Sequence, residues 1–152
     1  MDSFDTKDSK VYVWPWMKGT RINAIKCSPA NCQTAVAYEN GSLQVYDYHK
    51  KKALCLDVVH HSRITALDWS QKTILTGSKD NLIKMKDERT FEAVMEFEEV
   101  HKQEVLGVKR SGHLIASGGN DNIVAIYDIR NSLNVLYSYE HEAAVKSLAW
   151  AQ

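Results

Sequence analysis

Short segments in which apolar and polar residues alternate with a period of two occur along most of the chain. In one of them Leu43 and Val45 fall on the same face, and the segment ends in Asp47. A period of two is typical of a half-buried β-strand, and no segment keeps the 3.6-residue period of an amphipathic helix over three turns. The best helical candidate, residues 92–105, fits better as strand, acidic turn and strand. The pattern therefore predicts an all-β fold.

These strands recur with a period of 40 to 42 residues. One set of aligned segments is RINAIKCSP (21–29), RITALDWSQ (63–71), EVLGVKRSG (104–112) and AVKSLAWAQ (144–152). A second set, lying between the first, is AYENGSLQVYD (37–47), GSKDNLIKMKD (77–87) and GGNDNIVAIYD (118–128). Such a period, with four short strands in each repeat, is the sequence signature of a β-propeller. We predict blades of four antiparallel strands in an incomplete ring, about three full blades plus parts of two.

The repeat also predicts where the blades begin and end. Residues 1–20 would form the end of a first blade with its outer strand missing or shortened, 21–59 blade two, 60–100 blade three, 101–140 blade four, and 141–152 the innermost strand of blade five. Propellers usually close with 4 to 8 blades. The chain is therefore expected to be a fragment or a reduced protein, and its open strand edges predict self-association.

Each predicted innermost strand has a small residue at the same position of the repeat. These residues are Ala24, Ala66, Gly107 and Ser147. Innermost strands crowd around a narrow axis, where a bulky side chain would collide with its neighbours. We therefore expect Gly107→Val to destabilise the fold by more than about 2 kcal/mol.

Composition and charge argue against several functional classes of protein. Lys plus Arg and Asp plus Glu both number 19, so the zero formal charge argues against a nucleic-acid binder held by a positive field. No apolar run approaches the roughly 20 residues of a membrane helix, and the N-terminus lacks the apolar region of a secretory signal. The three cysteines, an odd number without a CxxC pair, predict reduced, partly buried thiols of an intracellular protein. No metal or cofactor is expected.

Histidines recur four residues before the aligned aliphatic position. The predicted polar network within single blades consists of His60, Thr76 and Asp80, and of His101, Ser117 and Asp121; a third histidine of the repeat is His141. A catalytic triad would use the same residue types, but a catalytic site occurs once whereas this arrangement recurs with the repeat. We therefore predict hydrogen bonds that pin a loop to a turn, and no enzymatic activity.

These repeat positions resemble WD repeats, although the Trp-Asp pair is replaced by Tyr46-Asp47, Lys86-Asp87 and Tyr127-Asp128. A longer stretch is more specific: HKQEVLGVKRSGHLIASGGNDN (101–122) followed by EHEAAVKSLAW (140–150). It closely resembles the fizzy-type activators of the anaphase-promoting complex, the family of cell division cycle protein twenty and its late-mitotic homologue. The resemblance covers about residues 11 to 150.

The resemblance implies a non-catalytic substrate receptor and activator that binds degrons of cell-cycle proteins and brings them to the ubiquitin ligase. It implies anaphase-promoting complex subunits, degron-bearing proteins and checkpoint proteins as partners, in nucleus and cytoplasm, with no nucleic acid, membrane or cofactor. The family's other main degron groove needs a last blade that this sequence does not contain. A generic WD-repeat scaffold in another nuclear or cytoplasmic complex is the alternative, and an enzyme built on a propeller ranks last.

The resemblance also implies two degron-binding residues. Asn120 and Asn122 match the family positions that contact a Lys-Glu-Asn degron on the top face, and an Asn amide offers the donor and the acceptor that such side chains need. The alternative is that both asparagines only shape a tight turn. If Asn122 faces solvent, Asn122→Ala should hardly change the fold.

Overall fold

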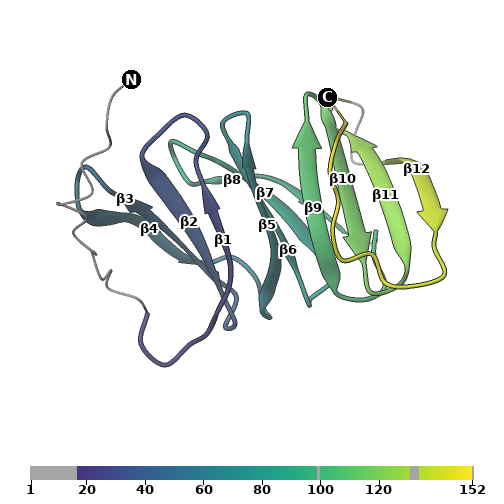
Figure 1. The fold of residues 1–152 in the computed structure, drawn as a ribbon, viewed down its shortest axis with the longest axis horizontal. Helices are drawn as coiled ribbons and strands as arrows, with labels where there is room; N and C mark the ends of the chain where they lie inside the picture. The colour runs from purple at the N-terminus through teal and green to yellow at the C-terminus, as the bar shows by residue number, and fades with distance from the viewer. Residues whose placement is uncertain (1–16, 99, 131–133, 152) are drawn as a thin grey trace, which may run out of the picture.

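The computed structural model describes residues 17–98, 100–130 and 134–151, and every strand in it belongs to one of three four-stranded antiparallel sheets (Figure 1). The first sheet contains β1 (Ile22–Cys27), β2 (Gln33–Tyr38), β3 (Ser42–Asp47) and β4 (Lys52–Val58). The second contains β5 (Ile64–Ser70), β6 (Thr73–Ser78), β7 (Ile83–Asp87) and β8 (Ala93–Phe97). The third contains β9 (Val105–Ser111), β10 (Leu114–Gly119), β11 (Ile123–Asp128) and β12 (Val135–Glu140). The predicted all-β fold of four-stranded antiparallel blades is confirmed. Across the described residues, none lies in a helix long and apolar enough to cross a membrane.

Each sheet is a meander in which consecutive strands pair, and the first strands, β1, β5 and β9, lie beside one another in the middle of the molecule (Figure 1). The register shifts at the same place in all three sheets, near the start of the first strand: between Ile22 and Ala24, between Ile64 and Ala66, and opposite Gly118 and Gly119. Such bulges increase local twist and re-aim side chains. They are part of the repeat and not an irregularity of one blade.

The first strands of neighbouring sheets are linked through side chains. β5 packs beside both β1 and β9. The Asn23 amide donates to the Ile64 carbonyl at 3.1 Å, and the Thr65 hydroxyl donates to the Val105 carbonyl. Asn23 and Thr65 occupy the same repeat position, within the bulge. The bulge therefore lets one polar side chain per blade satisfy a carbonyl on the next blade.

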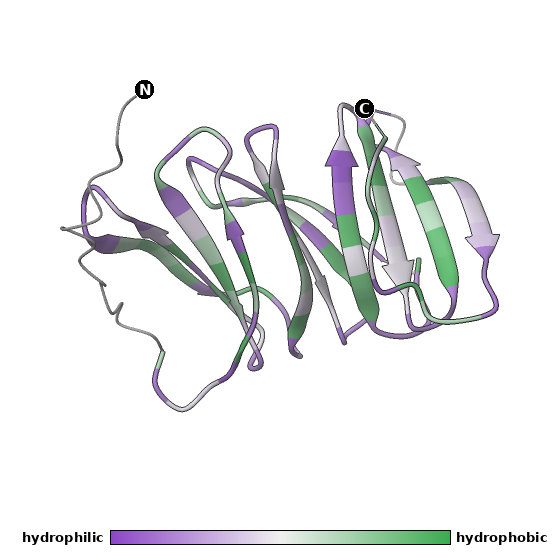
Figure 2. Cartoon of the chain, in the orientation of Figure 1, coloured by the Kyte–Doolittle hydropathy of each residue, from purple (hydrophilic) through white to green (hydrophobic). Residues whose placement is uncertain are grey.

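Two apolar layers fill the spaces between the sheets. Leu43 and Val45 of the first sheet pack with Ile74 of the second, whereas Leu75 packs on the other side with Tyr127 of the third sheet. Ile74 and Leu75, which are neighbours on β6, thus pack in different layers, because successive side chains of a strand point to opposite faces. Hydrophobic residues are concentrated along the strands and polar residues at the strand ends (Figure 2).

The positions of tightest packing differ from those predicted. A Cβ atom on Gly107 would find its nearest neighbour, Leu148 Cδ1, at an ordinary 3.6 Å. A Cβ on Gly77 would lie 2.6 Å from Val105 Cγ1, and one on Gly118 would lie 2.5 Å from Val145 Cγ1. The expected collision at Gly107 is therefore not found for a Cβ atom, the first carbon of any larger side chain at this position. The close approaches occur on the second strands of the second and third sheets, against which Val105 and Val145 of the following repeats pack.

The described strands fall within 21–59, 60–100 and 101–140, while the numbering of these blades in a ring stays a prediction. Most of residues 1–20 lies outside the described residues. The segment predicted as a fifth innermost strand packs against the third sheet through Val145 and Leu148 but forms no ladder with another strand.

The thiols also differ from expectation: Cys27 and Cys32 are exposed, and only Cys55 is half-buried.

Candidate functional site

The three turns that join the second and third strands of the sheets lie at the same end of the molecule as the connections between sheets. We call this end the turn face; it lies at the lower edge of the third sheet in Figure 1. The His60 N–H donates to the Gly41 carbonyl at 3.1 Å, and the His141 N–H donates to the Asn122 carbonyl at 2.7 Å. These bonds tie the first and third turns to the segments that follow β4 and β12.

The three turns share one backbone conformation. Gly41, Asn81 and Asn122 occupy the same repeat position and have positive φ values of 82°, 72° and 68°. Asparagine and glycine tolerate this left-handed region better than other residues. The preceding Asn40, Asp80 and Asp121 each accept the backbone N–H two residues further on, at 3.1 to 3.2 Å. This short side-chain bond stabilises the turn.

In the second and third sheets the turn aspartate also holds a buried histidine. His60 Nδ1 lies 3.0 Å from Asp80, and its Nε2 lies 2.8 Å from the Thr76 hydroxyl. His101 lies 3.0 Å from Asp121 and 2.8 Å from the Ser117 hydroxyl. Each aspartate further accepts the N–H of the residue that follows its histidine. The structure therefore brings together all six residues of the predicted polar network. They form two separate hydrogen-bonded series, one in the second sheet and one in the third.

The electrostatics of the His60–Asp80 pair favour a neutral histidine beside an ionised aspartate. Burial lowers the pKa of His60, although Asp80 acts in the opposite direction. Burial also opposes ionisation of Asp80, but His60 and the N–H groups of Leu82 and His61 together hold the pKa of Asp80 below its ordinary value. Nδ1–H then donates to the carboxylate and Nε2 accepts the Thr76 hydroxyl proton. Both histidine side chains are fully buried, which suits a structural network.

The residues that replace the WD tryptophan behave differently in the two sheets. Tyr127 Oη lies 3.3 Å from Ser117 Oγ, and burial raises the pKa of Tyr127 so that its hydroxyl stays protonated. In the second sheet Lys86 Nζ instead contacts Asp57 of the first sheet at 2.6 Å and the Phe91 carbonyl at 2.8 Å. The lysine thus links two sheets, whereas the tyrosine extends the hydrogen-bonded chain within one.

The two asparagines have different surroundings. Asn122 is half-buried at the left-handed position of its turn, where its backbone bonds Gly119 and His141. Asn120 is exposed, its N–H donates to the Glu104 carbonyl at 2.8 Å, and its side-chain Nδ2 donates to Gln103 Oε1 at 2.9 Å. Asn122 therefore lies within the turn and Asn120 is presented to solvent, while degron binding by either residue stays a prediction.

The residues equivalent to Asn120 in the other sheets are Glu39 and Lys79, and all three donate a backbone N–H to the residue before the bulged strand. The turn face thus carries an acid, a base and an amide at matched positions. Arg63, just before β5, pairs with Glu104, just before β9, at 2.7 Å and lies 3.8 Å from Glu39. The predictions from sequence missed this ion pair, although Arg63 and Glu104 stand at the same position, just before the aligned aliphatic residue.

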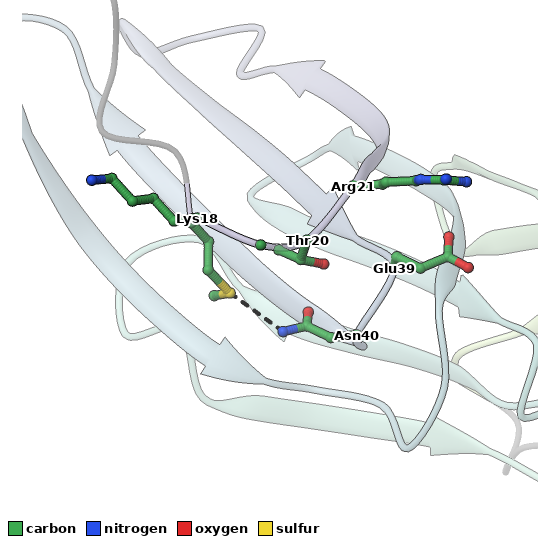
Figure 3. Close-up of a pocket in the computed structure, with 7 residues that line it drawn as sticks. Lys18, Thr20, Arg21, Glu39 and Asn40 are labelled. Carbon is green, nitrogen blue, oxygen red and sulfur yellow. Dashed lines mark hydrogen bonds between the residues drawn. The ribbon is translucent and has the colours of Figure 1, made fainter.

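A polar cavity of about 420 Å³ opens beside the first turn. It is lined by Met17, Lys18, Gly19, Thr20, Arg21, Glu39 and Asn40 (Figure 3). The Arg21 and Glu39 side chains extend in the same direction, whereas Lys18 extends the opposite way (Figure 3). The Asn40 amide donates to the Met17 sulfur at 3.3 Å. No group of three or more potential metal ligands occurs among the residues that the structure describes.

Both the sequence and the fold are similar to those of known proteins. The family described as "WD domain, G-beta repeat" matches residues 53–87 and 92–128. The chain is 36% identical to "APC/C activator protein CDH1" of Saccharomyces cerevisiae over 80% of this chain and 22% of that protein. It is 30% identical to "Meiotic fizzy-related protein 1" of Schizosaccharomyces pombe, over 94% of this chain and 37% of that protein. It is 33% identical to "Cell division cycle 20.1, cofactor of APC complex" of Arabidopsis thaliana, over 94% and 36%.

Solved structures give the same fold. A chain of "Crystal Structure of Mitotic Checkpoint Complex" superimposes with a TM-score of 0.81 at 30% identity, over 89% of this chain and 42% of that chain. The computationally designed Ika4 protein superimposes with a TM-score of 0.82 at 20% identity, over 92% and 85%, which concerns the fold alone. The chain spans between 22% and 37% of the length of the relatives described above. It therefore corresponds to part of a propeller.

Proposed function

We propose that this chain, a WD-repeat segment of the fizzy type, is the part of an anaphase-promoting complex activator that contacts degrons through its turn face. The activator would bind degron-bearing cell-cycle proteins and ligase subunits, with checkpoint proteins as further partners, and would carry out no chemistry itself. We further propose that it acts in the nucleus and cytoplasm. The names and sequence identities of its relatives support this role.

The observation that carries the proposal is the exposed Asn120 on a rigid turn. Its backbone N–H is bonded to Glu104, and the adjacent Asp121 is held by His101 and by the Lys102 N–H. A group presented on a pre-ordered turn loses little conformational entropy when it binds a peptide. The amide can donate and accept, as a ligand containing Glu and Asn side chains requires.

The test is a titration of the 152-residue chain with a Lys-Glu-Asn peptide, followed by NMR chemical shifts, with an Ala-Ala-Ala peptide as control. Affinity should be weak, about 1 mM or −4 kcal/mol, because few residues contribute. Asn120→Ala should weaken binding by about 1 kcal/mol for a lost hydrogen bond. The matched control is Lys79→Ala, at the equivalent position of the second sheet. Shifts confined to Glu96 and Glu98, with none in 118–122, would mean binding by charge alone and would contradict the proposal.

We also propose that the chain, when produced alone, self-associates through its open blade edges, the edge strands β4 and β12. Tyr137 and Tyr139 on β12 are 72% and 65% exposed, and Leu56 and Val58 on β4 are 56% and 69% exposed. Apolar faces of this kind favour association in water. Light scattering should give a mass above 17.3 kDa that rises with concentration. A monomer at all concentrations would contradict the proposal.

A further inference from the structure

Two exposed amide side chains meet on the turn face of the third sheet. Gln103 lies in the connection that precedes β9, and Asn120 lies in the turn between β10 and β11. The Asn120 Nδ2 donates a hydrogen bond to Gln103 Oε1 at 2.9 Å. Neither backbone is free to move, since the Asn120 N–H is bonded to Glu104 and the Lys102 N–H is bonded to Asp121. The bond therefore acts mainly on the orientation of the side chains.

The orientation of an asparagine amide decides what it offers to a ligand. A half-turn of the amide exchanges its acceptor oxygen for its donor nitrogen at almost the same shape. While Nδ2 donates to Gln103, Oδ1 is directed away from Gln103 and can accept. In the structure the Glu104 carboxylate is instead engaged with Arg63, which donates to its two oxygens at 2.7 and 2.9 Å, and Gln103 is the acceptor of the Asn120 amide.

We propose that Gln103 is a positioning residue that fixes the polarity of the Asn120 amide. It holds Nδ2 toward β9, so that Oδ1 faces the bound peptide as an acceptor for a donor group. The donor is an ammonium or a side-chain amide of the Lys-Glu-Asn peptide, and in this respect the inference rests on the proposed function. Gln103 touches Asn120 and need not touch the peptide.

The test compares three variants of the 152-residue chain with the unchanged chain. Gln103→Met keeps the length of the side chain but removes the acceptor. Gln103→Glu keeps acceptor oxygens and has no donor group. Its side chain can therefore only accept from Asn120 Nδ2, as in the proposed orientation. Lys102→Met is the matched control, because it changes the neighbouring exposed side chain and leaves the Lys102 N–H in place. Thermal unfolding of all variants checks that the fold is retained.

Two readouts are needed. The first is the pair of Asn120 side-chain amide proton resonances without peptide, which should shift in Gln103→Met and stay near their original positions in Gln103→Glu and Lys102→Met. The second is affinity for the Lys-Glu-Asn peptide, which should fall about fivefold in Gln103→Met, as expected for one lost hydrogen bond. Gln103→Glu should restore binding, at an ionic strength high enough to screen its added charge.

The outcomes separate this inference from the proposed function. Unchanged Asn120 resonances in Gln103→Met overturn the inference, whatever the peptide does. Changed resonances with an unchanged affinity also overturn it. Changed resonances in a chain that binds no Lys-Glu-Asn peptide would support the orientation while the proposed function fails.

Discussion

Arg63 donates from Nε and Nη2 to the two carboxylate oxygens of Glu104, at 2.7 and 2.9 Å. The pair joins the starts of β5 and β9, the first strands of two neighbouring sheets. Hydrogen bonds from Arg63 lower the pKa of Glu104, with burial acting in the opposite direction. Such a planar two-bond pair fixes geometry as well as charge.

This pair predicts a specific response to acid. Since the pKa of Glu104 is lowered in the folded state, its contribution is present above the ordinary value of 4.5 and is lost as the pH falls through the folded value. Glu104→Gln should therefore lose less stability than the unchanged chain between pH 6 and pH 3. The measurement is urea unfolding across this range, with Glu98→Gln as an exposed control. A Glu104→Gln chain as acid-sensitive as the unchanged one would contradict the prediction.

The glycines give a second prediction. Gly77→Ala should destabilise the fold by about 1–3 kcal/mol, because its Cβ would lie 2.6 Å from Val105 Cγ1 in a packed layer. Gly107→Ala should change stability far less, because its nearest neighbour would lie at 3.6 Å. Denaturation midpoints of the two variants test this directly. Equal effects would mean that the two strands are equally crowded.

The turn conformation gives a third prediction. Asn122 has a φ of 68°, a region that costs an alanine about 1 kcal/mol or more. Asn122→Ala should therefore destabilise the fold by about this amount, contrary to the expectation from sequence, whereas Asn122→Gly should change it by less than half as much. The free energies of unfolding of both variants provide the measurement. If both lose the same stability, the side chain and not the backbone conformation is responsible.

The buried histidine gives a fourth prediction. Burial lowers the pKa of His60 in the folded state, so the unfolded chain binds its proton more readily. Stability should fall as the pH drops below about 6.5, the ordinary histidine value, toward the folded pKa. His60→Gln should be less stable at pH 7.5 but should show a smaller decrease between pH 7.5 and pH 5.5. The exposed His49→Gln serves as control and should keep the full decrease.

The strands, the period of the repeat and the two His–Asp–hydroxyl series could be predicted from the sequence. Alternation with a period of two fixes which side chains share a face, as for Leu43 and Val45, and a repeat shows which positions are equivalent. Residues of one blade are joined by short turns, so His101, Ser117 and Asp121 could be connected without knowledge of neighbouring blades. Local spacing was sufficient for all of these features.

The contacts between blades could not be predicted in this way, because they depend on the tertiary structure. The contact of Gly77 with Val105, the pair of Arg63 with Glu104 and the bond of Lys86 to Asp57 each join residues of different sheets. Their distances depend on how far one sheet is rotated and shifted against the next, which no local pattern encodes. The sign of φ at Asn122 was likewise hidden, because asparagine is compatible with both a solvent-facing side chain and a left-handed turn. Sequence periodicity specifies each blade, and the packing of blades against one another specifies the face that they jointly present.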